Sequence, residues 1–140
     1  MVLGMGLPEE LASLLEGEFP RLVPREPEGE DCIHNLLYIF LSVKGYHVNY
    51  TAGRARPDLV VRKPRGRVEV PIEVKFTGTA SNVDKGIEQL LGYMKGTDWK
   101  AGLLFVWDKS KKAAAFSRAR ELRKVEKRGR IVIVVAVKKE

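Results

Sequence analysis

Two carboxylates and an amine lie within residues 56–76, a stretch with the pattern of two strands joined by a turn. Asp58 precedes the first apolar stretch, and Glu73 and Lys75 come near the end of the second. Carboxylates at close range bind hard divalent cations, and an amine beside them can orient a water molecule or offset the charge of a phosphate. These residue types therefore predict a hydrolytic site that uses a divalent metal.

The turn of this predicted hairpin falls at Pro64 and Gly66, because proline presets φ and glycine tolerates the positive φ that turns often need. The second strand alternates, so one set of side chains is expected in the core and the other on an exposed face. The core set is Ile72, Val74 and Phe76, and the exposed set is Glu73, Lys75 and Thr77.

The spacing of the two carboxylates follows from the turn. A turn centred after Pro64 pairs Asp58 with about Pro71. Glu73 is then a diagonal neighbour of Asp58, at a side-chain spacing of roughly 7 Å or less. One cation can bridge carboxylates at that range, and the backbone carbonyl of Val74 is a further candidate ligand.

Helices and strands along the rest of the chain must position this hairpin. Apolar periodicity predicts helices over residues 7–19, 30–44, 81–94 and 109–128. Strands outside the hairpin are predicted over residues 46–50, 101–107 and 131–137. The order of these elements predicts an α/β fold with a mixed central sheet flanked by helices.

Length and composition indicate one domain over residues 1–140. Residues 1–27 form a helical arm with a Pro-rich connector, and residues 28–140 form the core. The net charge is −6 over residues 1–31 but +9 over residues 109–140. The acidic arm can cap the domain, mediate dimerisation or shield a basic groove, and of these the sequence favours the cap.

The net charge of +7 favours a polyanionic partner, with nucleic acid first. The alternative is the solvated surface of a thermophile protein, because Lys, Arg and Glu are abundant while the chain has one Gln and three Asn. The single Cys32 excludes an internal disulfide framework. We find no export signal and no apolar run long enough to cross a bilayer, so we expect a cytoplasmic protein with no membrane partner.

Pro57-Asp58 followed by Glu73-Val74-Lys75 resembles the PD-(D/E)xK signature of the restriction-endonuclease-like nuclease superfamily. The predicted order of helix, hairpin, helix and strand is similar to the αβββαβ core of that superfamily. The resemblance implies a deoxyribonuclease that depends on Mg²⁺ or Mn²⁺, hydrolyses phosphodiester bonds and leaves a 5′-phosphate. In the alternative interpretation, the same charges form a salt-bridged structural hairpin.

A second match lies on the next predicted helix. Gln89 and Tyr93 form a QxxxY element whose type and placement resemble the RecB-like branch of the superfamily. In that branch the amide and the phenol, one helical turn apart, help to hold the active site and the substrate. Lys85 lies on the same side of this helix, and a solvated helix face is the alternative interpretation. The resemblance as a whole covers roughly residues 30–107.

A third match concerns the first core helix, where RecB-like members often carry a His and other branches carry a Glu. This chain has both, because Glu30 and His34 are four residues apart on one helical edge. The resemblance makes either of them a metal ligand or a group that positions one. The alternatives are a structural histidine beside an apolar face and a glutamate that favours the helix dipole.

The resemblance implies a role for each group. The metal ligands would be Asp58, Glu73, the carbonyl of Val74, and Glu30 or His34. Lys75 would orient the attacking water, and the catalytic set would be completed by Gln89 and Tyr93. We expect contacts to the nucleic-acid backbone from Arg54, Arg56 and Lys85, and more remote contacts from Lys109, Lys111 and Lys112.

Three other functions fit parts of the sequence. A nucleic-acid-binding module with a purely structural hairpin has the same basic surface and no turnover. A Holliday-junction resolvase shares the fold but acts as a homodimer on four-way junctions, whereas the QxxxY element favours the RecB-like branch. An interaction subunit would bind a partner through the acidic arm.

Overall fold

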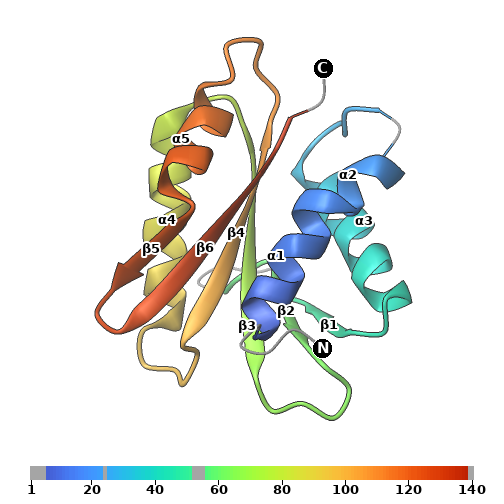
Figure 1. The fold of residues 1–140 in the computed structure, drawn as a ribbon, viewed down its shortest axis with the longest axis vertical. Helices are drawn as coiled ribbons and strands as arrows, with labels where there is room; N and C mark the ends of the chain where they lie inside the picture. Colours follow the sequence, from blue (N-terminus) through green and yellow to red (C-terminus); the bar gives the residue numbers. More distant parts are fainter. Residues whose placement is uncertain (1–5, 24, 52–55, 139–140) are drawn as a thin grey trace.

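The central sheet has six strands in the order β1-β2-β3-β4-β6-β5 (Figure 1). The computed structural model describes residues 6–23, 25–51 and 56–138. The strands are β1 (His47–Tyr50), β2 (Leu59–Arg62), β3 (Glu69–Thr77), β4 (Ala101–Asp108), β5 (Lys124–Lys127) and β6 (Arg130–Val137). The helices are α1 (Leu7–Gly17), α2 (Phe19–Leu22), α3 (Glu30–Val43), α4 (Ala80–Met94) and α5 (Ala114–Leu122).

Strand direction changes across the sheet. β1, β2 and β3 pair antiparallel, whereas β3, β4 and β6 run parallel to one another. Parallel neighbours need a crossover connection, and α4 supplies it between β3 and β4. β5 ends the sheet as an antiparallel edge strand beside β6. The predicted α/β fold with a mixed sheet is confirmed.

Helices cover both faces of this sheet, with α1, α2 and α3 on one side and α4 and α5 on the other (Figure 1). Alternation along β4 sends Leu103 and Phe105 into the first core and Leu104 and Val106 into the second. The buried strand predicted over residues 101–107 is therefore confirmed, because both of its faces are covered.

The N-terminal helix α1 lies across β4 and β6 on the first face. Its buried stripe includes Leu11 and Leu15, which have no exposed surface. On its outer side, Oε1 of Glu16 lies 3.6 Å from Nη1 of Arg120. This helix thus covers one face of the sheet and turns carboxylates outward. Within the described ranges, no helix is long and apolar enough to span a membrane.

The helix predicted over residues 109–128 is wrong in extent, because it begins later. The carboxylate of the buried Asp108 accepts the N–H of Ser110 at 2.7 Å and the N–H of Phe116 at 2.8 Å. These bonds fix the intervening residues as a loop, so α5 starts only at Ala114. Burial by itself raises the pKa of Asp108, but the hydrogen bonds outweigh it and lower the pKa below its ordinary value.

The same predicted helix also ends earlier, and a hairpin follows it. Arg128 and Gly129 have φ angles of 54° and 76°, in the left-handed region that a two-residue hairpin turn needs. The turn places Lys127 opposite Arg130. Val125 fits the apolar spacing of the predicted helix, but it packs against the second core from β5. The pattern therefore predicted a helix where the chain forms a strand.

Candidate metal centre

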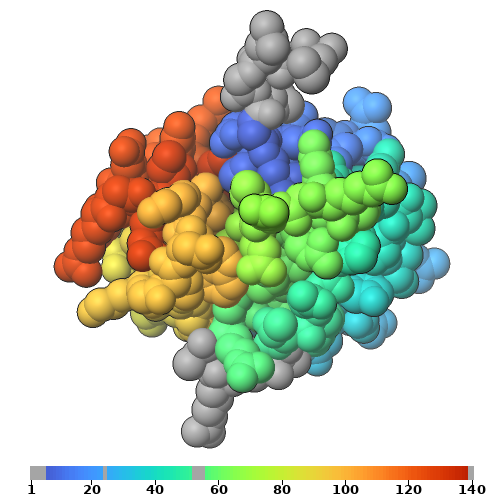
Figure 2. Space-filling view, turned by 90° about the horizontal axis from the view of Figure 1, so that it is seen from below, coloured from blue at the N-terminus to red at the C-terminus, as the bar shows by residue number. Residues whose placement is uncertain are grey.

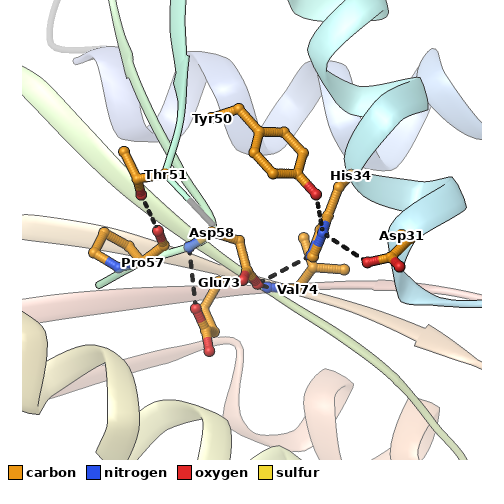
Figure 3. A network of polar contacts seen from close by, with 8 residues as sticks. All are labelled: Asp31, His34, Tyr50, Thr51, Pro57, Asp58, Glu73 and Val74. Carbon is orange, nitrogen blue, oxygen red and sulfur yellow. Dashed lines mark hydrogen bonds and ion pairs between the residues drawn. The ribbon is translucent and has the colours of Figure 1, made fainter. Parts of the chain in front are cut away.

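The site lies where the pairing between β2 and β3 ends. The last pair of this ladder is Leu59 with Ile72, while β3 continues beside β4. Among the described residues, no strand pairs with this edge of β3 beyond Ile72. Asp58 takes that place with its side chain, because its Oδ2 accepts the N–H of Val74 at 2.8 Å (Figure 3).

The backbone of Val74 offers the site a carbonyl as well. In an extended strand, the N–H and the C=O of one residue face the same edge. The carbonyl of Val74 is therefore turned toward the edge that Asp58 occupies. This orientation suits the predicted role of that carbonyl as a metal ligand.

The register of the hairpin differs from the prediction by two residues. Asp58 lies opposite Glu73 and not opposite Pro71, since its N–H donates to Oε1 of Glu73 at 3.3 Å. The expected turn is present, with the N–H of Gly66 donating to the carbonyl of Lys63 at 3.0 Å. Two further unpaired residues precede β3 and shift the register. A shift by an even number keeps every side chain on its predicted face.

The face that carries Glu73 is buried, contrary to the prediction of an exposed face. Glu73 and Thr77 are each 5% exposed, because α4 packs on this side of β3. Lys75 lies between them and is partly buried. A Cβ atom on Gly86 of α4 would come within 3.2 Å of Cγ of Lys75. Glycine at position 86 thus leaves room for the lysine stem beneath the helix.

Two carboxyl groups at the site hold protons more tightly than usual. Burial and the nearby Asp58 raise the pKa of Glu73 to about 7, and Lys75 opposes this shift. Glu30 is exposed as a whole, but loss of water around its carboxyl is the largest cause of its raised pKa, and Lys75 again opposes the shift. Lys75 acts on both carboxyls, so its ammonium lies within electrostatic reach of both.

His34 reaches this edge from α3. Its Nε2 lies 3.2 Å from Oδ2 of Asp58 (Figure 3). Nε2 is buried, and apart from this contact with Asp58 it has no hydrogen-bond partner among the described residues. Burial tends to lower the pKa of His34, but the contact with Asp58 and the charge of Glu30 outweigh it and raise the pKa above its ordinary value.

Glu30, His34 and Asp58 can each turn one ligand atom to a common point, since these atoms lie within 4.8 Å of one another. A buried imidazole nitrogen without a partner fits a cation at that point. The sequence left open whether Glu30 or His34 is the ligand from the first core helix, and the structure brings both of them to Asp58. Glu73 is outside this group, and its Oε1 accepts the backbone N–H of Asp58.

Tyr50 is a site residue that the sequence did not indicate. Its hydroxyl lies 3.0 Å from Nδ1 of His34, and this bond leaves Nε2 as the nitrogen that faces Asp58 (Figure 3). The next residue, Thr51, donates its N–H to the carbonyl of Asp58 at 3.1 Å. The available signal was position, because Tyr50 ends β1 and pairs with Leu59, the residue after Asp58.

Tyr93 lines a hollow of about 340 Å³ whose wall includes Pro57, the residue before Asp58. Arg56 forms part of the same wall. Burial and the charges of Glu73 and Asp58 raise the pKa of Tyr93, so its hydroxyl lies within reach of both carboxylates. The structure thus brings Tyr93 and Arg56 to the site.

The other predicted residues lie farther out. Gln89 and Lys85 are exposed on α4 and line a shallow surface hollow with Asp84 and Glu88. Lys109, Lys111 and Lys112 are exposed in the loop after β4. Arg54 is outside the described residues.

Comparison with known proteins adds no assignment to this geometry. The chain matches no family model, no curated protein and no solved structure. The chemistry of the site therefore follows from its own groups: Asp58 in contact with Glu73, the buried Nε2 of His34 facing Asp58, and Lys75 within electrostatic reach of the carboxyls.

Proposed function

We propose that the protein is a divalent-metal-dependent nuclease of the PD-(D/E)xK type that hydrolyses phosphodiester bonds in DNA. The observation that carries this proposal is the buried Nε2 of His34, which faces Asp58 within a cluster of three ligand atoms. The order α3, β1, β2, β3, α4, β4 supports it, because this is the αβββαβ order of that nuclease core.

The donor set fits Mg²⁺ or Mn²⁺. Carboxylate and carbonyl oxygens suit both ions, and an imidazole nitrogen favours Mn²⁺. Asp58, Glu30 and His34 would hold the ion, together with the carbonyl of Val74. When bound, such an ion lowers the pKa of water and neutralises negative charge on a phosphate.

The protein's own groups then act on the substrate. Lys75, held under α4, offsets charge on the phosphate or orients the attacking water. Burial and Asp58 raise the pKa of Glu73, so its carboxyl keeps a proton to higher pH than a free glutamate, and a cation beside Asp58 would favour the ionised form of Glu73. Arg56 and Tyr93 line the hollow in which the strand beside the scissile bond would lie.

Tyr93 and Gln89 support the RecB-like branch unequally. The charges of Glu73 and Asp58 act on the Tyr93 hydroxyl and help to raise its pKa, which supports a role for Tyr93 near the carboxylates. Gln89 is exposed one turn earlier, so its proposed role would begin only when substrate is bound. Tyr93→Phe is therefore expected to slow hydrolysis more than Gln89→Ala does, and Gln89→Ala is expected to leave the affinity for Mn²⁺ unchanged.

The test is hydrolysis of labelled single-stranded, duplex, flapped and four-way-junction DNA with Mg²⁺ or Mn²⁺. Asp58→Asn keeps the shape of the side chain but removes its charge, and we expect hydrolysis to fall by more than about 100-fold. Asp98→Asn removes an exposed carboxylate between α4 and β4 and serves as the matched control. Equal hydrolysis by both variants and the wild type would refute the site.

The same experiment separates the other functions. DNA binding without hydrolysis in any metal would indicate a nucleic-acid-binding module. Hydrolysis restricted to four-way junctions would indicate a resolvase. Calorimetric titration of Mn²⁺ into the wild type and into His34→Gln tests the ligand set independently of activity, and unchanged affinity would remove His34 from it.

A further inference from the structure

A second hollow, of about 390 Å³, lies between the end of α4 and the β5–β6 hairpin. Four basic side chains line it, and the only acidic one among the described lining residues is Glu88. The basic residues are Lys95, Lys127, Arg128 and Arg130. Figure 2 shows this end of the molecule, with the hairpin (red) beside the segment that connects α4 to β4 (yellow to orange).

The charges in this hollow are unbalanced. Nζ of Lys127 contacts Oε1 of Glu88 at 2.9 Å, which leaves Lys95, Arg128 and Arg130 without a carboxylate partner among the described residues. The C-terminal end of α4 carries a partial negative charge that opposes an anion, but it is equivalent to only about half an elementary charge. The three cations outweigh it, so the hollow favours an anion.

Arg130 is held ready for such a ligand. Its Nη2 donates to the carbonyl of Thr97 at 3.2 Å, which fixes the guanidinium. Its Nη1 is buried and has no hydrogen-bond partner among the described residues. A buried donor on a charged group is costly to leave unpaired, and an anionic oxygen in the hollow would satisfy it.

The hairpin turn holds the basic groups in a fixed arrangement. Lys127 and Arg130 are opposite one another in the ladder, and Arg128 lies at the tip between them. Arg128 adopts a φ of 54°, which asparagine or glycine adopts more easily. The turn thus presents an arginine at a position where smaller residues are the usual choice.

Thr97 connects this hollow to the proposed active site. Its carbonyl accepts from Arg130, while Thr97 itself lines the hollow shared by Arg56 and Tyr93. The chain neighbours Gly92 and Tyr93 also line one hollow each. An extended polyanion that crosses Thr97 would occupy both hollows, whereas an isolated small anion would fill only one, so the arrangement favours a nucleic-acid strand.

We propose that the hollow under the β5–β6 hairpin binds a backbone phosphate of the nucleic acid, away from the scissile bond. The guanidinium of Arg130 is the anchor, and Lys95 and Arg128 supply surrounding positive charge. Phosphodiester oxygens accept the forked N–H groups of arginine, which gives affinity without sequence preference. The identity of the ligand rests on the proposed function.

The test measures binding alone. Labelled duplex DNA is titrated in EDTA over a series of NaCl concentrations, by fluorescence anisotropy. Lys95→Gln with Arg128→Asn removes two exposed cations, and asparagine tolerates the left-handed turn. We expect weaker binding and a slope of log K against log [NaCl] that is shallower by about 0.9 for each lost phosphate contact.

Arg21→Gln with Arg25→Gln is the charge-matched control, because both arginines are exposed in the N-terminal arm. Equal slopes for the wild type and the hairpin variant, or an equal loss in the control, would overturn the proposal. Displacement of DNA by inorganic phosphate or polyglutamate at the same concentration of charge would also overturn the nucleic-acid assignment. A wild type that binds in this way but never hydrolyses DNA would defeat the proposed function and leave this site standing.

Discussion

Oδ2 of Asp58 accepts the N–H of Val74 at 2.8 Å. The aspartate side chain thus replaces the backbone carbonyl that a neighbouring strand would supply at this edge of β3. The same oxygen lies 3.2 Å from Nε2 of His34. One carboxylate therefore both accepts a hydrogen bond from β3 and faces the candidate metal ligand His34. A substitution at Asp58 can remove its charge while keeping the hydrogen bond, or remove both.

Asp58→Ala and Asp58→Asn should differ in stability. Alanine leaves the partly buried N–H of Val74 without its acceptor, which costs about 1–3 kcal/mol, whereas the amide oxygen of asparagine can still accept it. Urea unfolding of both variants in EDTA measures the difference. Equal free energies of unfolding would show that the bond to Val74 contributes no stability.

Glu73 should make the metal-free protein less stable as the pH rises. Its pKa is raised from 4.5 to about 7 in the folded state, so the folded protein binds the proton more tightly than the unfolded chain does. The contribution of Glu73 to the free energy of unfolding is fully present below pH 4.5 and is lost as the pH rises through about 7. The full effect is up to about 3 kcal/mol.

Thermal unfolding in EDTA between pH 5 and pH 8 tests this expectation, with Glu73→Gln as the reference. The wild type should lose more stability than the variant over this range, because glutamine does not titrate. Mn²⁺ should restore much of the loss at pH 8 through preferential binding to the folded state. A parallel pH dependence for the two proteins would contradict the raised pKa.

Tyr50→Phe should weaken metal binding without disturbing the fold. The hydroxyl is the partner of Nδ1 of His34, and loss of such an orienting group lowers metal affinity or activity by about 10- to 100-fold. Tyr38→Phe is the matched control, because Tyr38 is 42% exposed on the same helix as His34. Calorimetric titration with Mn²⁺ gives the affinities, and equal values for both variants would exclude an orienting role.

Gly86→Ala should perturb Lys75 through packing. The new Cβ would lie 2.8 Å from Cδ1 of Leu104 and 3.2 Å from Cγ of Lys75, and overpacking of this kind costs about 1–3 kcal/mol. Gly92→Ala is the control on the same helix, since nothing lies within 4 Å of its added Cβ, and a gain of about 0.5–1 kcal/mol is expected there. Melting temperatures and hydrolysis rates that are the same in both variants would show that Gly86 does not govern Lys75.

The site's main carboxylates were predictable because alternation determines which face a strand residue joins. The register error at Asp58 was two residues, an even number, so Asp58 and Glu73 still met. The sequence could not choose between Glu30 and His34, because helical spacing gives only a shared edge. Their common approach to Asp58 depends on how α3 packs against the sheet.

Residues 109–128 were predicted less well, since Val125 fits the apolar spacing of a helix but packs against the core from a strand. The deciding interactions are the capping of α5 by the buried Asp108 and the left-handed turn at Arg128 and Gly129. The first joins residues on two different elements, and the second places an arginine where sequence rules expect asparagine or aspartate. Local pattern therefore pointed to one long helix.

The edge strand β5 has a consequence for self-association. It is four residues long, and the exposed side chains of Lys124, Glu126 and Lys127 flank its free backbone. Short strands with charged side chains resist the addition of a further strand. The sheet is therefore not expected to continue into a second copy of the chain at β5, and any homodimer should form through a different surface.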